Sequence, residues 1–294
     1  MEFIIKNAFY EATVSTYGAE LISLKNADGR ELLWQNNLGE GWNNHAPLLF
    51  PFCGRLKDKE FIKDGKAYPM KIHGFANVSE FDVSEKSDES VTLTLSANEE
   101  TRAIFPYGFK LSAVYTLSGD KLTLKVTVEN TGDEILPFVF GWHPGFNLPT
   151  EDGQDINDYA VKFMSERSEL SRAVFTSDLT VPGRFEPYPI ENSEYKLCED
   201  EIYARDTMVF RDTGSDVKLY AKGHPFELNM SWSDNLPVLC IWKMPKNDAK
   251  YICIEPWTHS TARGERSNDI DVRPMIRLGC GESEDFKYSL QFKF

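Results

Sequence analysis

The chain has 294 residues, 41% of them hydrophobic and 27% charged, a balance typical of a globular protein rather than a disordered or membrane-embedded one. Its formal net charge is -14 and no run of Lys and Arg occurs, which disfavours nucleic acid and anionic membranes as partners. The five cysteines are scattered without a Cys-x-x-Cys pair, so we expect reduced thiols and no structural zinc.

The N-terminal residues do not have the pattern of a signal peptide. Met1-Glu-Phe-Ile-Ile-Lys6 has an early acid, no basic start and no long apolar run. No later segment reaches transmembrane length. We therefore expect a cytoplasmic protein.

Alternating apolar and polar residues predict antiparallel strands over 90–96, 110–117 and 121–129. In the last of these, every second residue from Leu122 to Val128 is apolar, while Thr, Lys and Glu take the other face. This is the pattern of a strand with one buried side.

Turn residues separate several of these strands. Ser118-Gly-Asp120 predicts a hairpin turn, and Ala27-Asp-Gly29 predicts another between 21–24 and 31–34. Short helical turns are expected near 99–105 and 150–160, but no long amphipathic helix.

The acidic, turn-rich stretches at 150–158 and 191–201 are interpreted as loops or insertions, because strand-like sequence resumes after each. Many strands, few helices and no linker predict an all-β fold. We expect a single domain over 1–294, built as a large sandwich of antiparallel sheets.

Four segments interrupt the strand pattern with residues that a turn does not require. The first, Phe50-Pro-Phe-Cys-Gly-Arg55, ends in an arginine whose fork of N–H groups can bind ligand oxygens, although a solvated loop arginine is the simpler reading. The second, Ile72-His-Gly-Phe-Ala76, places His73 before a glycine that permits a sharp turn; a structural histidine is the alternative.

The third segment, Phe140-Gly-Trp-His-Pro-Gly-Phe146, puts His143 where a strand over 135–140 ends, a place where ligand groups often lie. A histidine that caps a turn is the alternative. In the fourth, Tyr251-Ile-Cys-Ile-Glu-Pro-Trp257, Glu255 ends an apolar strand, where burial would raise its pKa toward that of a useful base. A sheet-end Glu paired with a surface Lys is the alternative.

Together the four segments supply proton donors, an acceptor and a fixed cation. Trp142 and Trp257 add candidate faces on which a sugar ring could stack. The chain has no Gly-x-Ser-x-Gly, no phosphate-binding glycine loop and no His-Glu-x-x-His, so we expect neither a metal nor a cofactor.

The order of these motifs resembles the aldose 1-epimerases. Arg55 is followed by His-Gly-Phe-Ala at 73–76, Gly-Trp-His-Pro-Gly-Phe at 141–146 and Ile-Glu-Pro-Trp at 254–257. The likeness extends over nearly the whole chain and is greatest to the LacX-like branch of the galactose mutarotase-like superfamily.

The resemblance implies a supersandwich of antiparallel sheets with an open sugar cleft. It assigns His143 as the general acid on the ring oxygen, Glu255 as the general base on the anomeric hydroxyl and His73 as an assisting group. Arg55 would hold sugar hydroxyls, and Asp206 would be the substrate-binding carboxylate, with Asp200 and Asp212 nearby as alternatives.

The chain departs from the LacX-like pattern after Glu-Pro-Trp. It continues Thr-His-Ser-Thr-Ala-Arg over 258–263, where relatives more often carry an aromatic residue and Gly. The rim of the cleft, and with it the substrate, is therefore expected to differ.

Anomer exchange requires that a proton leave the C1 hydroxyl while another reaches the ring oxygen. A carboxylate and an imidazolium do both, so we expect Glu255 ionised and His143 charged in the resting enzyme, each supporting the state of the other.

Three other functions are alternatives. A phosphorylated hexose would need a further cation, for which Arg263, Arg266 and Lys57 are available. A sugar-binding module without turnover is a second alternative. A glycoside hydrolase is disfavoured because it needs two carboxyls and only Glu255 stands out. The sequence leaves a monomer and a homodimer open.

Overall fold

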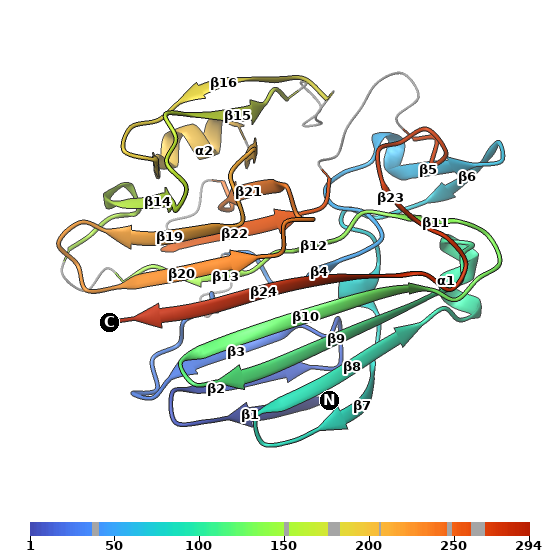
Figure 1. Cartoon of the computed structure of the whole chain (residues 1–294), viewed down its shortest axis with the longest axis horizontal. Coiled ribbons are helices and arrows are strands. Elements are labelled where there is room, and N and C mark those ends of the chain that lie inside the picture. Colours follow the sequence, from blue (N-terminus) through green and yellow to red (C-terminus); the bar gives the residue numbers. More distant parts are fainter. Residues whose placement is uncertain (37–40, 150–152, 176–182, 206, 246–248, 260–267) are drawn as a thin grey trace.

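The computed structural model describes residues 1–36, 41–149, 153–175, 183–205, 207–245, 249–259 and 268–294. Strands dominate this part of the chain, and the all-β fold class is confirmed (Figure 1). All named strand pairs in it are antiparallel. A single domain over 1–294 stays a prediction.

The larger sheet contains nine strands within the described residues. In spatial order they are β17 (Glu194–Lys196), β14 (Tyr159–Phe163), β19 (Asp216–Ala221), β20 (Glu227–Trp232), β24 (Ser283–Lys293), β10 (Lys121–Asn130), β9 (Phe109–Ser118), β8 (Ser90–Ser96) and β7 (Asp82–Lys86). The C-terminal strand β24 therefore lies inside the sheet, between β20 and β10.

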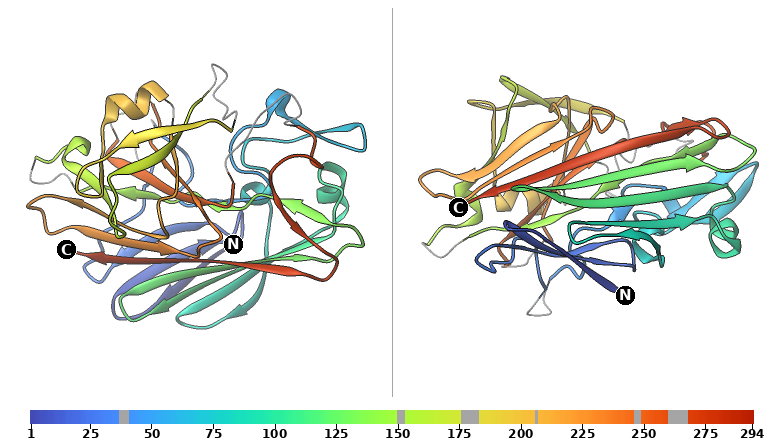
Figure 2. Two further views of the ribbon diagram at one scale, coloured as in Figure 1. Left: turned by 45° about the horizontal axis from the view of Figure 1, so that its top comes forward. Right: turned by 60° about the horizontal axis from the view of Figure 1, so that its bottom comes forward.

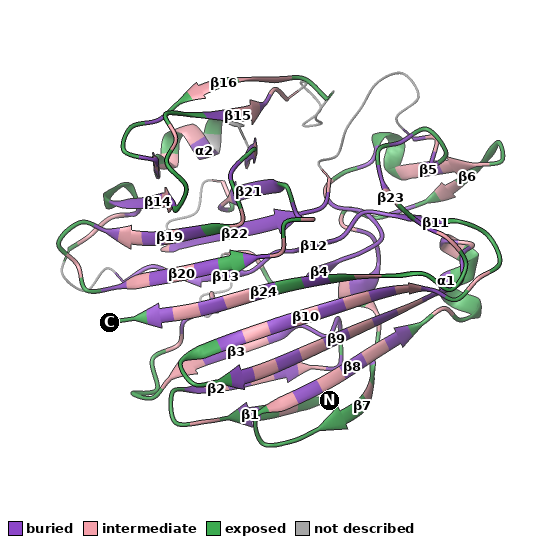
Figure 3. Ribbon diagram, viewed as in Figure 1, coloured by how far each residue is buried: buried purple, intermediate pink, exposed green. Residues whose placement is uncertain are grey.

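A second sheet has eight strands among the residues that the structure covers. Its path is β16 (Phe185–Pro189), β15 (Glu169–Ala173), β18 (Thr207–Arg211), β21 (Val238–Trp242), β22 (Tyr251–Trp257), β12 (Gly141–Trp142) and β4 (Leu48–Leu49), with β13 (Gly145–Asn147) also paired to β22. Every residue of β22 is buried (Figure 3).

Smaller sheets and short helices complete the described fold. The sheets are β1 (Glu2–Lys6), β2 (Tyr10–Ser15) and β3 (Leu21–Asn26); β5 (Glu60–Lys63) and β6 (Lys66–Pro69); and β11 (Leu136–Phe138) and β23 (Ile276–Leu278). The helices are α1 (Glu99–Ile104), α2 (Glu199–Arg205) and the 3-10 turns η1 (Lys57–Lys59), η2 (Ala76–Val78) and η3 (Ile156–Asp158). No helix of the described residues is long and apolar enough to span a membrane.

Aromatic side chains join the two large sheets. Phe286 of β24 stacks on Phe140 with ring centroids 4.8 Å apart. The Tyr288 hydroxyl donates to the Pro256 carbonyl of β22 at 3.3 Å. The N-terminal sheet β1–β3 lies beside β8 and β9 (Figure 2), and the hydroxyl of Tyr115 in β9 donates to the Ala19 carbonyl.

The alternating patterns give the strands that they predict. In β10 the apolar positions from Leu122 to Val128 are fully buried, while the intervening Thr and Lys side chains are partly exposed. The hairpin at 118–120 is confirmed, since Ser118 pairs with Lys121. The turn at 27–29 is followed by only an isolated bridge from Lys25 to Glu31 rather than by a paired strand.

The helix near 99–105 is confirmed as α1, whose N-terminus is capped reciprocally by Asn98 and Thr101. Near 150–160 the described part contains η3, which is only one turn. The stretch 191–201 is not a plain loop, because β17 and the beginning of α2 lie there, and the alternative of an insertion stays a prediction. Local polarity hid both elements, since the strand has three residues and the first helical turn is acidic.

Candidate active site

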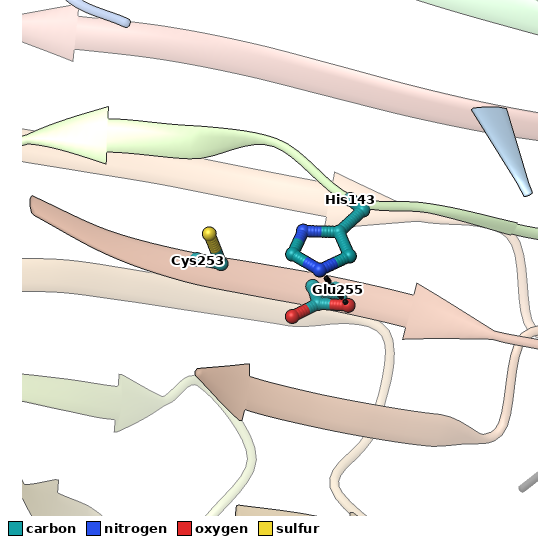
Figure 4. A group of neighbouring side chains, drawn as sticks. All are labelled: His143, Cys253 and Glu255. Carbon is teal, nitrogen blue, oxygen red and sulfur yellow. Dashed lines mark ion pairs between the residues drawn. The ribbon is translucent and has the colours of Figure 1, made fainter. Parts of the chain in front are cut away.

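His143 and Glu255 meet because of the strand register. Gly141 of β12 pairs with Trp257 of β22, and Gly145 of β13 pairs with Cys253. His143, midway between Gly141 and Gly145, therefore lies opposite Glu255, midway between Cys253 and Trp257. His143 Nε2 lies 3.3 Å from Glu255 Oε2 (Figure 4).

Both side chains of this pair are withdrawn from solvent. The His143 side chain is 7% exposed and that of Glu255 is 2% exposed. Burial lowers the pKa of His143 well below its ordinary value, and the neighbouring His73 lowers it further. Burial therefore opposes the charged imidazole that the sequence led us to expect at rest, and that expectation stays a prediction.

His73 lies beside the pair, with its ring centroid 5.4 Å from that of His143 and the two planes nearly perpendicular. The Gly54 N–H donates to His73 Nδ1 at 3.0 Å, which leaves the proton of the neutral ring on Nε2. Burial, and after it the positive charge of Arg55, lower the pKa of His73 to about 3. His73 is thus a neutral hydrogen-bond donor at physiological pH.

A backbone clamp fixes the position of His73. Gly74 has φ +80°, and a Cβ there would lie 2.2 Å from the carbonyl oxygen of Phe50. That same oxygen accepts the N–H groups of Phe75 and Ala76. The segments 50–55 and 71–76 are therefore held against each other, and Arg55 is exposed next to His73.

The two tryptophans proposed as stacking faces lie in different surroundings. Trp142 is fully buried, donates its indole N–H to the Ala46 carbonyl at 2.9 Å and packs on Tyr288. It belongs to the core, so its assignment as a sugar-stacking face is not supported. Trp257 is 6% exposed and lies 6.1 Å from the His73 ring, with its indole nitrogen lacking a partner among the described residues.

Sequence reasoning missed two other tryptophans. Trp42 stacks on His143 with ring centroids 4.5 Å apart, and Trp242 packs edge-on against His143 at 5.4 Å. Both are only partly buried. Trp242 ends an apolar strand and Trp42 stands alone in a polar stretch, so neither has a local motif that could have identified it.

Four other residues were proposed to bind the sugar or a phosphate on it. Asp206, Arg263 and Arg266 lie outside the described residues. Lys57 begins η1 and is exposed.

His143, Cys253 and Glu255 are the donors that could hold a metal ion in the described part of the chain, with ligand atoms within 4.8 Å of one another (Figure 4). Burial raises the pKa of the Cys253 thiol well above its ordinary value, and Glu255 acts in the same direction. Metal ions bind the thiolate, so this environment disfavours Cys253 as a ligand.

The family model of aldose 1-epimerase matches residues 1–265. Protein LacX (plasmid) of Lactococcus lactis subsp. lactis is 29% identical over 288 residues, which span 94% of each chain. A putative glucose-6-phosphate 1-epimerase of Escherichia coli K12 is 21% identical over 94% of this chain and 89% of its own.

Solved structures agree with this match. A galactose mutarotase related enzyme from Lactobacillus acidophilus superposes with a TM-score of 0.91 at 32% identity, over 99% of this chain and 97% of its own. A galactose mutarotase-like protein from Lactobacillus casei gives a TM-score of 0.88 at 28% identity, over 99% and 100% of the two chains.

Proposed function

Because the chain belongs to the aldose 1-epimerase family, and is therefore a sugar epimerase, we propose that it interconverts the α and β anomers of a hexose by general acid–base catalysis. The observation that carries the proposal is the contact of 3.3 Å between His143 and Glu255 in a buried site. In a pyranose the ring oxygen and the anomeric hydroxyl are bonded to the same carbon. Their acid and base must therefore be close neighbours, as these two side chains are.

In the proposed reaction Glu255 accepts the proton of the C1 hydroxyl while His143 gives a proton to the ring oxygen. The bond between C1 and the ring oxygen breaks, and the C1 hydroxyl becomes an aldehyde. Rotation about the C1–C2 bond presents the other carbonyl face, and the reversed proton transfers close the ring. His73 donates a hydrogen bond from Nε2 to a substrate oxygen, and Arg55 binds hydroxyl groups.

Whether His143 carries the proton depends on Glu255 as well as on His143 itself. A carboxylate 3.3 Å from Nε2 favours the imidazolium when it is itself ionised, against the effect of burial. The two groups then titrate as a unit holding one proton. Activity falls in acid when the pair gains a second proton and in alkali when it loses the one it has, so the pH profile is a bell.

The proposal is tested by polarimetry on freshly dissolved α-glucose and α-galactose with and without protein. Glu255→Gln should lower kcat by about 10²–10⁴-fold, because the general base is lost, while calorimetry still detects sugar binding. Glu85→Gln, an exposed change on the edge strand β7, is the matched control and should keep full activity. Near-normal mutarotation by Glu255→Gln contradicts the assignment, and sugar binding without any rate increase by the unaltered protein indicates a binding module instead.

One observation favours a second candidate, an epimerase of a phosphorylated hexose. His259 follows Trp257 by two residues, and burial together with the charges of Arg211 and Arg273 lowers its pKa. The two guanidinium groups that act on His259 lie near the end of β22, and they, rather than the imidazole, would bind a phosphate. A kcat/KM for glucose 6-phosphate at least tenfold above that for glucose would favour this candidate.

A further inference from the structure

Trp42 covers one face of the His143 imidazole. The two ring centroids are 4.5 Å apart and the planes differ by 28°, which is a stacked arrangement. His143 Nε2 points toward Glu255, so the indole covers the ring without competing for that nitrogen. Nothing in the reaction proposed above uses Trp42.

The indole of Trp42 is held in place by its neighbours. The Trp34 indole N–H donates to the Trp42 carbonyl at 2.8 Å. Gly145 leaves room for the ring, since a Cβ there would lie 3.0 Å from the indole Cζ3 atom. Trp242 packs edge-on at 5.6 Å, and Tyr251 lies nearly parallel at 6.4 Å. The indole of Trp42 is therefore packed on several sides by aromatic neighbours and the Gly145 backbone.

The groups around His143 come from three further elements. Strand β22 contributes Glu255 and the Cys253 thiol, which burial keeps protonated. The segment 71–76 contributes His73, which is neutral and has the cationic Arg55 nearby. Strand β21 contributes the edge of Trp242, and Lys243 next to it is paired with Glu199 at 2.8 Å.

Glu255 is thus the anionic contact of His143 within the described residues, whereas burial and His73 oppose a charge on the ring. The face of an indole attracts a cation through its quadrupole, and the attraction is greatest where water is excluded. Trp42 offers such a face to the ring that must become an imidazolium.

We infer that Trp42 is a positioning residue for His143, which fixes the plane of the imidazole against Glu255 and stabilises its protonated form. The kinetic part of this inference rests on the proposed function, whereas the protonation of His143 does not. The inference therefore has a test that is independent of turnover.

The test compares Trp42→Leu, Trp42→Phe and Trp242→Leu. Trp42→Leu removes the stacked face, and Trp42→Phe keeps a smaller one. Trp242→Leu is the comparison variant, because it deletes the same volume beside His143 but removes only edge-on contacts, one with His143 and one with Trp42. The first readout is the NMR titration of the His143 ring, assigned with a His143→Gln variant. The second is the pH profile of kcat.

We expect His143 to titrate at lower pH in Trp42→Leu, since its charged form loses a favourable contact, and Trp42→Phe to lie between that variant and the unaltered protein. The alkaline limb of kcat should move to lower pH in parallel, with kcat near pH 7 reduced by about 3- to 10-fold. Trp242→Leu, which keeps the stacked indole, should displace the titration of His143 less than Trp42→Leu does.

An unchanged titration of His143 in Trp42→Leu overturns the inference, and so does an equal displacement in Trp242→Leu. Should Trp42→Leu fail to fold, Trp42→Phe decides the question by the same criterion. Absence of mutarotation in the unaltered protein refutes the proposed function alone, because the NMR titration is still read.

Discussion

Glu255 shows how far a buried carboxylate depends on its neighbours. Its side chain is 2% exposed in a strand whose other residues are apolar or aromatic, and a buried carboxylate needs a polar partner. His143 provides one at 3.3 Å. The sequence singled out both residues as candidates, but their protonation depends on neighbours that no local pattern reveals.

A prediction at this scale concerns His73→Asn. Asparagine tolerates the positive φ of +67° at this position, and its side-chain oxygen can accept the Gly54 N–H in place of Nδ1. The pKa of His73 is about 3 in the folded protein and near 6.5 when unfolded, so the unfolded chain binds more protons between these values. Folding stability is therefore lost as pH falls from 6.5 toward 3.

The variant lacks this titrating group and should lose less stability than the unaltered protein on acidification. Urea unfolding at pH 7 and pH 4.5 measures the difference. Equal losses in the two proteins would show that His73 is not held neutral by the fold.

At the scale of elements, the sequence indicates only part of the clamp between the segments 50–55 and 71–76. Gly74 was recognised as a residue that allows a turn, but the close approach of the Phe50 carbonyl makes glycine obligatory there. The sequence around Gly74 does not reveal this contact with Phe50, because the two segments are about twenty residues apart and meet only in the folded chain.

Gly74→Ala should accordingly destabilise the protein by roughly 3 kcal/mol or more, since its Cβ meets backbone atoms that cannot rotate away. Gly65→Ala is the matched control: it has a similar φ of +75° but nothing within 4 Å, so only the conformational cost of about 1–2 kcal/mol applies. Chemical denaturation measures both. Equal losses would mean that the contact with Phe50 is readily relieved.

For the whole molecule, the last strand completes the larger sheet. Strand β24 pairs with β10 on one side and β20 on the other, and its aromatic residues pack toward the smaller sheet that carries Glu255. The stability of the site therefore depends on residues at the C-terminal end of the chain.

Leu290→Ala removes a fully buried side chain of β24 and should cost about 2–5 kcal/mol, through lost burial and the cavity that remains. Lys287→Ala, an exposed change on the same strand, should alter stability by no more than about 0.5 kcal/mol. Thermal unfolding followed by circular dichroism distinguishes them. A small effect at Leu290 would mean that β24 contributes little to the core.

The sequence by itself determined the strands, because burial on one face imposes an alternation that is visible locally, and it determined the motif order that carries the family resemblance. Only the tertiary structure decided which tryptophan lies where. Trp142 is core because the C-terminal strand brings Tyr288 against it, and Trp42 reaches His143 from a remote loop. Spatial neighbours, and the electrostatics that follow from them, depend on contacts between distant segments, and these are specified by the packing of the whole chain rather than by any window of residues.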